Sequence, residues 1–129
     1  MLTQVSAEHP PQPGRPVRGS VTGRPIMASF DLLGRRWTLR IVCELSKESL
    51  GFNELRRRAS NMSKSVLSLR LQELVDAKVI HRDNESSSYE LTPLGRSLYV
   101  ALEPLFKWSN EWAAALGVNP DDSHDTELA

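Results

Sequence analysis

One stretch of the sequence, residues 51–77, restricts the possible folds more than any other. It reads GFNELRRRASNMSKSVLSLRLQELVDA, and its spacing predicts a short helix, a break of about four residues and a longer helix. Ser63 is expected to cap the longer helix and Asn53 the shorter one, because both residue types accept hydrogen bonds from backbone N–H groups at helix starts. Two helices joined this closely indicate a helix-turn-helix.

The longer helix has two different faces. Its apolar face can dock on a core and consists of Val66, Leu67, Leu71 and Leu74, with Lys78 at its end. The opposite face is small, polar and basic near the helix N-terminus, and consists of Lys64, Ser65, Ser68, Leu69 and Gln72. A recognition helix contacts bases and phosphates with such a face, although a plain solvated face has the same composition.

The charges of the chain are balanced in total but segregated along it. Its 129 residues, enough for one hydrophobic core, contain 16 Lys and Arg and 16 Asp and Glu. Residues 35–70 carry nine Lys and Arg against three Glu, a net charge of +6, whereas residues 71–129 have a net charge of −7. A polyanion would be attracted to one face and repelled by another, which would orient it.

Several classes of protein are not expected. No apolar run is long enough to cross a bilayer and no signal segment is recognisable, so we expect a cytoplasmic protein without a membrane partner. Cys43 is the single cysteine, which excludes an internal disulfide, and its neighbours favour a structural role. No catalytic pair or cofactor motif is present, so neither an enzyme nor a cofactor is expected. His81, Asp83 and Glu85 alternate on a strand, which suggests at most weak binding of a divalent ion.

The two ends of the chain are predicted to lie outside the folded domain of residues 25–116. Residues 1–24 are rich in proline and glycine and are expected to form a flexible arm. In the alternative interpretation, this arm contacts phosphates through Arg15, Arg18 and Arg24. Residues 117–129 are expected to form an acidic tail.

Two further helices are predicted before residue 51. Pro25 and Gly34 would begin and end the first, with Ile26, Phe30 and Leu33 on one side. The second is predicted from Trp37 to Glu48 and would place four residues in the core: Trp37, Ile41, Val42 and Leu45. Residues 50–52 are expected to form a short strand.

The pattern changes after Ala77. KVIHRD and SSYELT predict a β-hairpin with its turn at residues 84–87, which directly after a recognition helix would be a wing. Thr92 and Pro93 then predict the start of a long helix that stops at Gly117, with Pro104 kinking or splitting it. This helix carries more apolar surface than one small core can cover, which favours pairing with a second copy.

The order of these elements is that of a winged-helix transcription regulator, and the sequence resembles the HxlR-type family. The resemblance covers about residues 25–112 and rests on DLLGRRWTLRIVCEL, GFNELRRR, SKSVLSLRLQELVDAKVI, YELTPLGRSL and PLFKW. It implies a mainly α fold with a small β-hairpin and a long C-terminal dimerisation helix. It also implies a homodimer that binds double-stranded DNA at a pseudo-palindromic site, with recognition helices in successive major grooves ~34 Å apart.

The resemblance and the helix pattern together give candidate site residues. Those for DNA are Arg36, Asn53, Arg56, Arg57, Lys64, Ser65, Ser68, Leu69, Arg70 and Arg82. Those for the dimer are Phe30, Leu98, Leu102, Leu105, Trp108 and Trp112. Three consecutive arginines, 56–58, cannot all face DNA. Arg70 is expected either to contact a phosphate or to pair with Glu54 or Glu73, and Leu69 either to touch a thymine methyl group or to rest against a helix.

Three features depart from the family pattern, and one of them is Leu69, which stands where a polar residue is more usual. Arg24 stands where many members have a cysteine that some use to sense thiols or electrophiles, and the wing lacks the usual proline-arginine stretch. A pocket for any small-molecule effector is expected between the first and last helices of the dimer, but no residue pattern indicates a ligand. The exposed Leu69 and the acidic wing leave an alternative, in which the same helix binds protein rather than DNA.

Overall fold

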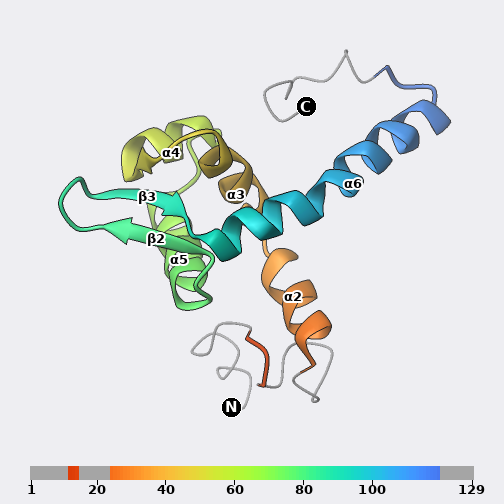
Figure 1. The fold of residues 1–129 in the computed structure, drawn as a ribbon. Coiled ribbons are helices and arrows are strands. Elements are labelled where there is room, and N and C mark those ends of the chain that lie inside the picture. Colours follow the sequence, from red (N-terminus) through yellow and green to blue (C-terminus); the bar gives the residue numbers. More distant parts are fainter. Residues whose placement is uncertain (1–11, 15–23, 120–129) are drawn as a thin grey trace, which may run out of the picture.

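The computed structural model describes residues 12–14 and 24–119, and Figure 1 shows its helices around a small sheet. In chain order the elements are α2 (Pro25–Leu33), α3 (Thr38–Lys47), β1 (Leu50–Gly51), α4 (Phe52–Arg58), α5 (Lys64–Asp76), β2 (Ile80–Asp83), β3 (Ser88–Leu91) and α6 (Pro93–Ala115). The predicted fold class is confirmed. The predicted arm lies outside the described residues except for 12–14 and 24, and the acidic tail except for 117–119.

The helix-turn-helix consists of α4 and α5. The Ser63 hydroxyl accepts a hydrogen bond of 3.1 Å from the Val66 N–H, so the predicted cap of α5 is confirmed. The prediction for Asn53 is wrong, because α4 begins at Phe52, two residues earlier than predicted, and Gly51 occupies its cap position. Lys78 also does not extend the apolar stripe, because α5 ends at Asp76 and the exposed Lys78 has a φ of 64° in the turn that follows.

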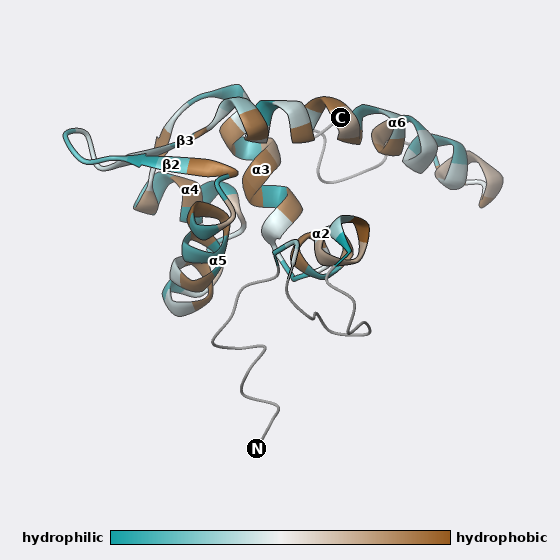
Figure 2. Ribbon diagram, turned by 60° about the horizontal axis from the view of Figure 1, so that its bottom comes forward, coloured by the Kyte–Doolittle hydropathy of each residue, from teal (hydrophilic) through white to brown (hydrophobic). Residues whose placement is uncertain are grey.

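The core lies where α3, α4 and α5 meet the sheet, and Figure 2 shows the apolar sides of these elements facing inward. Its fully buried side chains include Ile41, Val42, Leu45, Leu55, Leu67, Leu71, Leu74 and Ile80. Burying one such side chain stabilises the fold by roughly 1.5–3 kcal/mol. α2 contributes only Ala28 and Leu32, whereas Ile26 and Phe30 on its other side are exposed.

The sheet contains the predicted wing. β2 and β3 pair antiparallel, with Ile80 opposite Leu91 and Asp83 opposite Ser88, and β1 joins the other edge of β3. The Ser86 hydroxyl donates a 2.8 Å hydrogen bond to the Asp83 carboxylate, and this bond lowers the pKa of Asp83 below its ordinary value. The wing turn is therefore ordered by an acidic side chain rather than by a basic one.

α6 begins at the predicted cap. The Thr92 hydroxyl accepts a 3.0 Å hydrogen bond from Gly95 N–H and donates to the carbonyl of Lys78 at 2.7 Å. The predicted split at Pro104 does not occur, because α6 continues through it to Ala115. None of the helices in the described residues is both long and apolar enough to cross a membrane.

Candidate nucleic-acid interface

The outward face of α5 contains the residues that the helix pattern predicted. Lys64, Ser65, Ser68, Leu69 and Gln72 are all exposed. Leu69 is 48% exposed, so it does not rest against a neighbouring helix. Among the described residues, none forms an ion pair or hydrogen bond with the Lys64 ammonium group. Lys64 and Ser65 lie in the first turn of the helix, where the unpaired N–H groups and the helix dipole favour an anion such as phosphate.

The three arginines of α4 have different environments. Arg57 is the most exposed, and its guanidinium pairs with the Glu54 carboxylate through Nε at 3.0 Å and through Nη2. Arg58 also binds Glu54, and it reaches Glu48 at 2.8 Å. Hydrogen bonds from Arg57 and then Arg58 lower the pKa of Glu54 to about 2. Glu54 is therefore ionised at neutral pH and offsets part of the positive charge of α4.

Arg56 is used inside the helix-turn-helix. Its Nε donates a 2.6 Å hydrogen bond to the carbonyl of Met62, which is buried in the turn between the helices. That turn contains Ser60 and Asn61 with φ values of 62° and 55°, in the left-handed region. Arg56 therefore braces the turn through its Nε, and a DNA contact for this residue stays a prediction.

Three further candidates lie at the edges of this face. Asn53 on α4 and Arg82 on β2 are exposed, and Arg82 Nη1 is 3.4 Å from Asn84 Oδ1 in the wing. The exposed Arg36 lies over the ring of Trp37, with its guanidinium carbon 5.0 Å from the ring centroid. Trp37 was predicted to be the first residue of the second helix, but it lies just before α3. Its φ of 77° is rare for a bulky residue.

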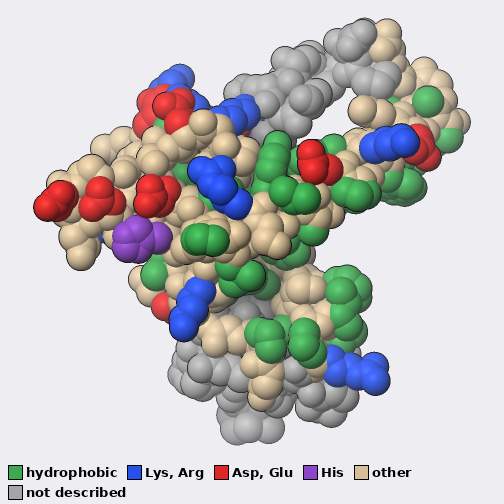
Figure 3. All heavy atoms as spheres, viewed as in Figure 1, with side chains coloured by type: hydrophobic (Ala, Val, Ile, Leu, Met, Phe, Trp, Pro, Cys, Tyr) green, Lys and Arg blue, Asp and Glu red, His purple; other side chains and the backbone are tan. Residues whose placement is uncertain are grey.

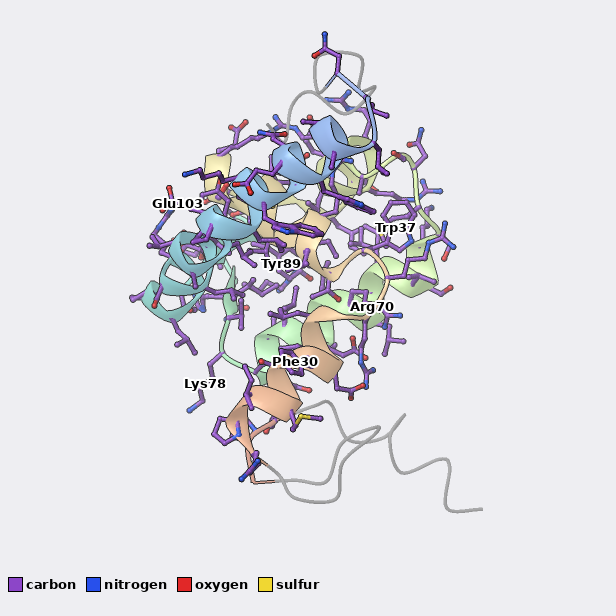
Figure 4. All side chains as sticks on the ribbon, turned by 90° about the vertical axis from the view of Figure 1, so that its right-hand side faces the viewer. Phe30, Trp37, Arg70, Lys78, Tyr89 and Glu103 are labelled. Carbon is purple, nitrogen blue, oxygen red and sulfur yellow. The ribbon has the colours of Figure 1, made fainter. Side chains whose placement is uncertain are left out.

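Arg70 forms the internal pair with Glu73 that was one of its predicted alternatives. Its Nη1 lies 3.1 Å from Glu73 Oε1, and its Nε donates a 2.8 Å hydrogen bond to the carbonyl of Arg36. The second oxygen of Glu73 binds Arg35 Nη1 at 2.5 Å, and Arg35 Nη2 is 3.3 Å from Asp31. Figure 4 shows Arg70 on α5 beside the turn that leads to Trp37.

The sequence analysis missed Arg35 and Glu73 as members of this cluster. The available signal was the position of Glu73 between Leu71 and Leu74, which places a carboxylate beside the apolar face of α5. A charged side chain at such a place is almost never buried unless it is paired. Because Asp31 and Glu73 lie outside residues 35–70 and pair with Arg35 and Arg70, the net charge of +6 overstates the positive charge of the surface.

A separate surface of α2 and α6 is apolar and exposed. Figure 3 shows hydrophobic side chains along α6 and on α2, on the side where both helices project from the body. The exposed large apolar residues include Ile26 and Phe30 on α2, and Leu105, Trp108, Trp112 and Leu116 along one side of α6. The rings of Trp108 and Trp112 stack with centroids 5.4 Å apart. We call these six residues the apolar face.

Two of the predicted dimer residues do not belong to this face. Leu102 is buried in the core of the protomer, and the prediction for it is corrected because its side chain has no surface to offer a partner. Leu98 is partly buried and packs against the same core. The one-sided pattern of a helix shows which residues are apolar, but it does not show where along the helix the core ends.

A cavity of about 370 Å³ lies between the turn after α2, helix α3 and α6. Its lining residues are Leu33, Arg35, Trp37, Leu39, Arg40, Cys43 and Phe106. Cys43 is 6% exposed, and burial followed by the charge of Glu44 raises the pKa of its thiol. The predicted structural role of Cys43 fits this buried position. Within residues 12–14 and 24–119, no three His, Cys, Asp or Glu side chains gather as metal ligands would.

Comparison with known proteins agrees with this geometry. The sequence model of the HxlR-like helix-turn-helix family matches residues 32–116. The HTH-type transcriptional regulator YvaP of Bacillus subtilis is 37% identical over 89 residues, which are 65% of this chain and 82% of YvaP. The regulator Rv3095 of Mycobacterium tuberculosis is 33% identical over 95 residues, 70% of this chain and 60% of Rv3095.

The fold is also similar to solved structures. The crystal structure of quinone-bound YodB from B. subtilis matches with a TM-score of 0.63 and 27% identity, over 67% of this chain and 94% of that one. The helix-turn-helix, the wing and the long last helix are thus found together in a regulator of known structure. This chain belongs to the HxlR-like helix-turn-helix family, whose members are DNA-binding transcriptional regulators and not enzymes.

Proposed function

We propose that this regulator binds a pseudo-palindromic operator as a homodimer, with α5 of each protomer in a major groove. The observation that carries the proposal is the exposed N-terminal half of α5, where a lysine, two serines and a leucine are presented on a helix whose other face is buried. Side chains of this kind at the start of a recognition helix reach both phosphates and base edges.

The candidate residues divide between two kinds of contact. Lys64, Ser65, Arg36 and Arg57 lie at exposed positions suited to phosphates, which fix the position of the protein on the duplex. Ser68 and Leu69 lie further along α5, where they would reach base edges, and the leucine side chain suits the methyl group of thymine. Asn53 and Arg82 would contact the backbone on either side of the groove.

Salt dependence of DNA binding tests this assignment. The logarithm of the affinity for a labelled duplex falls linearly with the logarithm of the salt concentration between about 50 and 200 mM. The slope of this line, called the salt slope here, is proportional to the number of phosphates contacted. Replacing Lys64 with Ala should weaken binding to all duplexes and reduce the salt slope by about one unit. Lys78→Ala is the matched control, because Lys78 is exposed beyond the C-terminal end of α5. An equal slope for the wild type and the Lys64 variant would reject Lys64 as a phosphate contact.

The homodimer is supported by the apolar face. Trp108 and Trp112 are 52% and 55% exposed, and Phe30 of α2 is 61% exposed. Apolar patches of this kind on a soluble domain mark interaction sites, and a symmetric pair would bury the same patch of both copies. Sedimentation velocity measures the mass directly, and a monomer at micromolar concentration would contradict the proposal.

One observation favours a second candidate function, in which α5 binds another protein. Leu69 is apolar and 48% exposed, and the wing next to α5 is acidic, with Asp83, Glu85 and Glu90. Figure 3 shows these acidic side chains gathered on the wing. An interface of this kind would bind partner protein with weak salt dependence, whereas binding to DNA is steeply salt-dependent.

We propose that a small-molecule effector would bind this chain non-covalently. The structure of YodB contains a quinone. In this chain the single cysteine, Cys43, is buried and its pKa is raised, so little reactive thiolate forms near neutral pH. The cavity beside Trp37 and Phe106, about 370 Å³ in volume, is large enough for a small aromatic molecule held by packing.

A further inference from the structure

The recognition helix α5 is joined to α2 mainly through charged side chains. α2 and α5 pack only loosely against each other. At the C-terminal end of α2, Glu73 of α5 binds Arg35, and Arg35 binds Asp31 of α2. Arg70 of α5 adds a bond to the carbonyl of Arg36 in the same turn. We call Asp31, Arg35, Arg70 and Glu73 the ionic link.

The opposite end of the α2–α5 interface is open. A cavity of about 270 Å³ lies between Pro25, Ala28 and Leu32 of α2 and the segment 76–79 that ends α5. Gln12 lines this cavity and donates a 3.1 Å hydrogen bond to the carbonyl of Asp76. The ionic link thus holds one end of the α2–α5 interface, while the other end borders this cavity.

Fold stability alone explains the ionic link poorly. Glu73 is 3% exposed, and Arg35 Nε is buried without a hydrogen-bond partner among the described residues. Burying charges removes them from water, and replacing a buried pair with apolar residues is often neutral or stabilising. Such a cluster does fix the relative positions of its side chains, since each carboxylate oxygen of Glu73 binds a different arginine.

We propose that Glu73 is a positioning residue, which sets the orientation of α5 relative to the helix that carries Phe30 and thereby the half-site spacing that the dimer accepts. The inference rests on the proposed function, in which α2 lies at the dimer interface and α5 in the groove. One inserted base pair moves a half-site by ~3.4 Å along the duplex and rotates it by roughly 35°. A rigid dimer cannot place both recognition helices in their half-sites after such a displacement.

The test compares duplexes that differ only in spacing. The wild-type protein first selects its preferred duplex from a random library, and its affinity is then measured for that duplex and for versions with one base pair inserted or removed at the centre. The wild type should lose at least about tenfold in affinity for either altered spacing. A wild type that selects no duplex would overturn the proposed function and this inference together.

Glu73→Gln and Arg35→Met each break the ionic link. Each variant should bind the preferred duplex more weakly and distinguish the three spacings by less than about threefold. The salt slope of Arg35→Met should stay unchanged, because Arg35 is mostly buried and is not proposed to contact phosphates. Glu103→Gln, on the exposed surface of α6, removes the same charge as Glu73→Gln and should keep the wild-type discrimination. Variants that bind the preferred duplex with undiminished discrimination would overturn the inference while leaving the proposed function intact.

A second measurement does not use DNA. A spin label on Cys introduced at the exposed Ser68, in a Cys43→Ser background, reports the distance between the two α5 helices of the dimer by pulsed electron resonance. Glu73→Gln should broaden this distance distribution if the ionic link fixes α5. If Glu73→Gln does not fold, Arg35→Met provides the comparison, because its Glu73 keeps Arg70 as a partner. An unchanged distribution in a folded variant would overturn the inference.

Discussion

Arg56, Arg57 and Arg58 are consecutive in the sequence, yet each lies in a different environment. Arg56 binds the Met62 carbonyl inside the turn, Arg58 joins two glutamates, and Arg57 projects furthest into solvent. A helix separates neighbouring residues by about 100°, so the residues of one run must point in different directions. A run of arginines in a sequence therefore does not measure the positive charge that a polyanion meets.

The Glu54–Arg57 pair gives a prediction about DNA affinity. Glu54 stays ionised at neutral pH, since its pKa is lowered to about 2 by Arg57 and then Arg58. Glu54→Gln removes the carboxylate that competes with a phosphate for Arg57, and it should steepen the salt slope by up to about 0.9 as Arg57 engages the phosphate more fully. Glu48→Gln is the control, because Glu48 binds Arg58 and not Arg57. Equal slopes for the two variants, from anisotropy titrations, would show that the removed charge and not Arg57 causes the change.

Cys43 should be protected from thiol reagents in the folded protein. Its thiol is almost inaccessible, and its pKa is raised by burial and by Glu44, so the thiolate forms only at higher pH. Labelling by a disulfide reagent at pH 8 should be at least about tenfold slower in buffer than in denaturant. A native rate close to that of the unfolded chain would mean that Cys43 is available to electrophiles.

At the residue scale, the sequence predicted which way a side chain points better than it predicted which residue the side chain contacts. The outward face of α5 followed from the 3.6-residue period, because a docked helix exposes whatever its apolar stripe does not contain. The partners of Arg56 and Arg35 depend on the path of a turn and on a residue 38 positions away. Neither can be read from local spacing.

Among the elements, α6 depends on a close approach at its first turn. Gly95 lies against the carbonyl of Val79, and a Cβ built on Gly95 would lie 2.1 Å from that oxygen. The same carbonyl accepts a 3.1 Å hydrogen bond from the Thr92 N–H, and it lies 3.0 Å from the Thr92 hydroxyl, whose single proton it shares with the Lys78 carbonyl. This junction packs the segment that follows the recognition helix directly against the first turn of the long last helix.

Gly95→Ala should therefore destabilise the protein, although alanine is the better helix former. Glycine within a helix ordinarily costs about 0.5–1 kcal/mol relative to alanine. Here the added methyl group would push Val79 away, and we expect the free energy of unfolding to fall by about 1–3 kcal/mol. Ser97→Ala, at an exposed position two residues later, should have little effect. Urea denaturation measures both, and a stabilised Gly95 variant would contradict the junction described here.

The boundaries of the elements were predictable where a side chain makes the cap. Ser63 and Thr92 cap α5 and α6 through their hydroxyls, as their sequence context indicated. Trp37 was placed inside a helix because its apolar ring fits the periodic pattern, but its positive φ puts it before α3. Strained backbone of this kind is imposed by tertiary contacts and leaves no sign in residue type.

At the scale of the whole molecule, the two proposed surfaces lie on different parts of the chain. Figure 1 shows α5 on the body of the fold and the C-terminal half of α6 projecting away from it. The sequence indicated two regions, because the basic residues precede Leu71 and the apolar stripe of the last helix follows Pro93, but it did not show which part of that stripe is exposed. It did not indicate the ionic link between them, which becomes visible only when α2 and α5 are brought together.

The last prediction concerns the dependence of stability on concentration. A homodimer that folds with its interface gains about 1.4 kcal/mol in free energy for each tenfold increase in protein concentration, so the Tm of the wild type should rise with concentration. Trp112→Glu places a charge in the centre of the apolar face and should give a monomer whose Tm is independent of concentration.

Val100→Glu tests whether this effect belongs to the apolar face rather than to α6 in general. Val100 is 61% exposed, comparable to Trp112, but it lies about 120° around the helix from Trp112. Its replacement should leave the dimer intact, because a charge on that side of α6 remains in water in both states. If both variants were monomers by sedimentation, the interface would extend around α6. If both remained dimers, the partner would have to contact a surface other than the two tryptophans, and the separation between the two α5 helices would have to be derived from that surface instead.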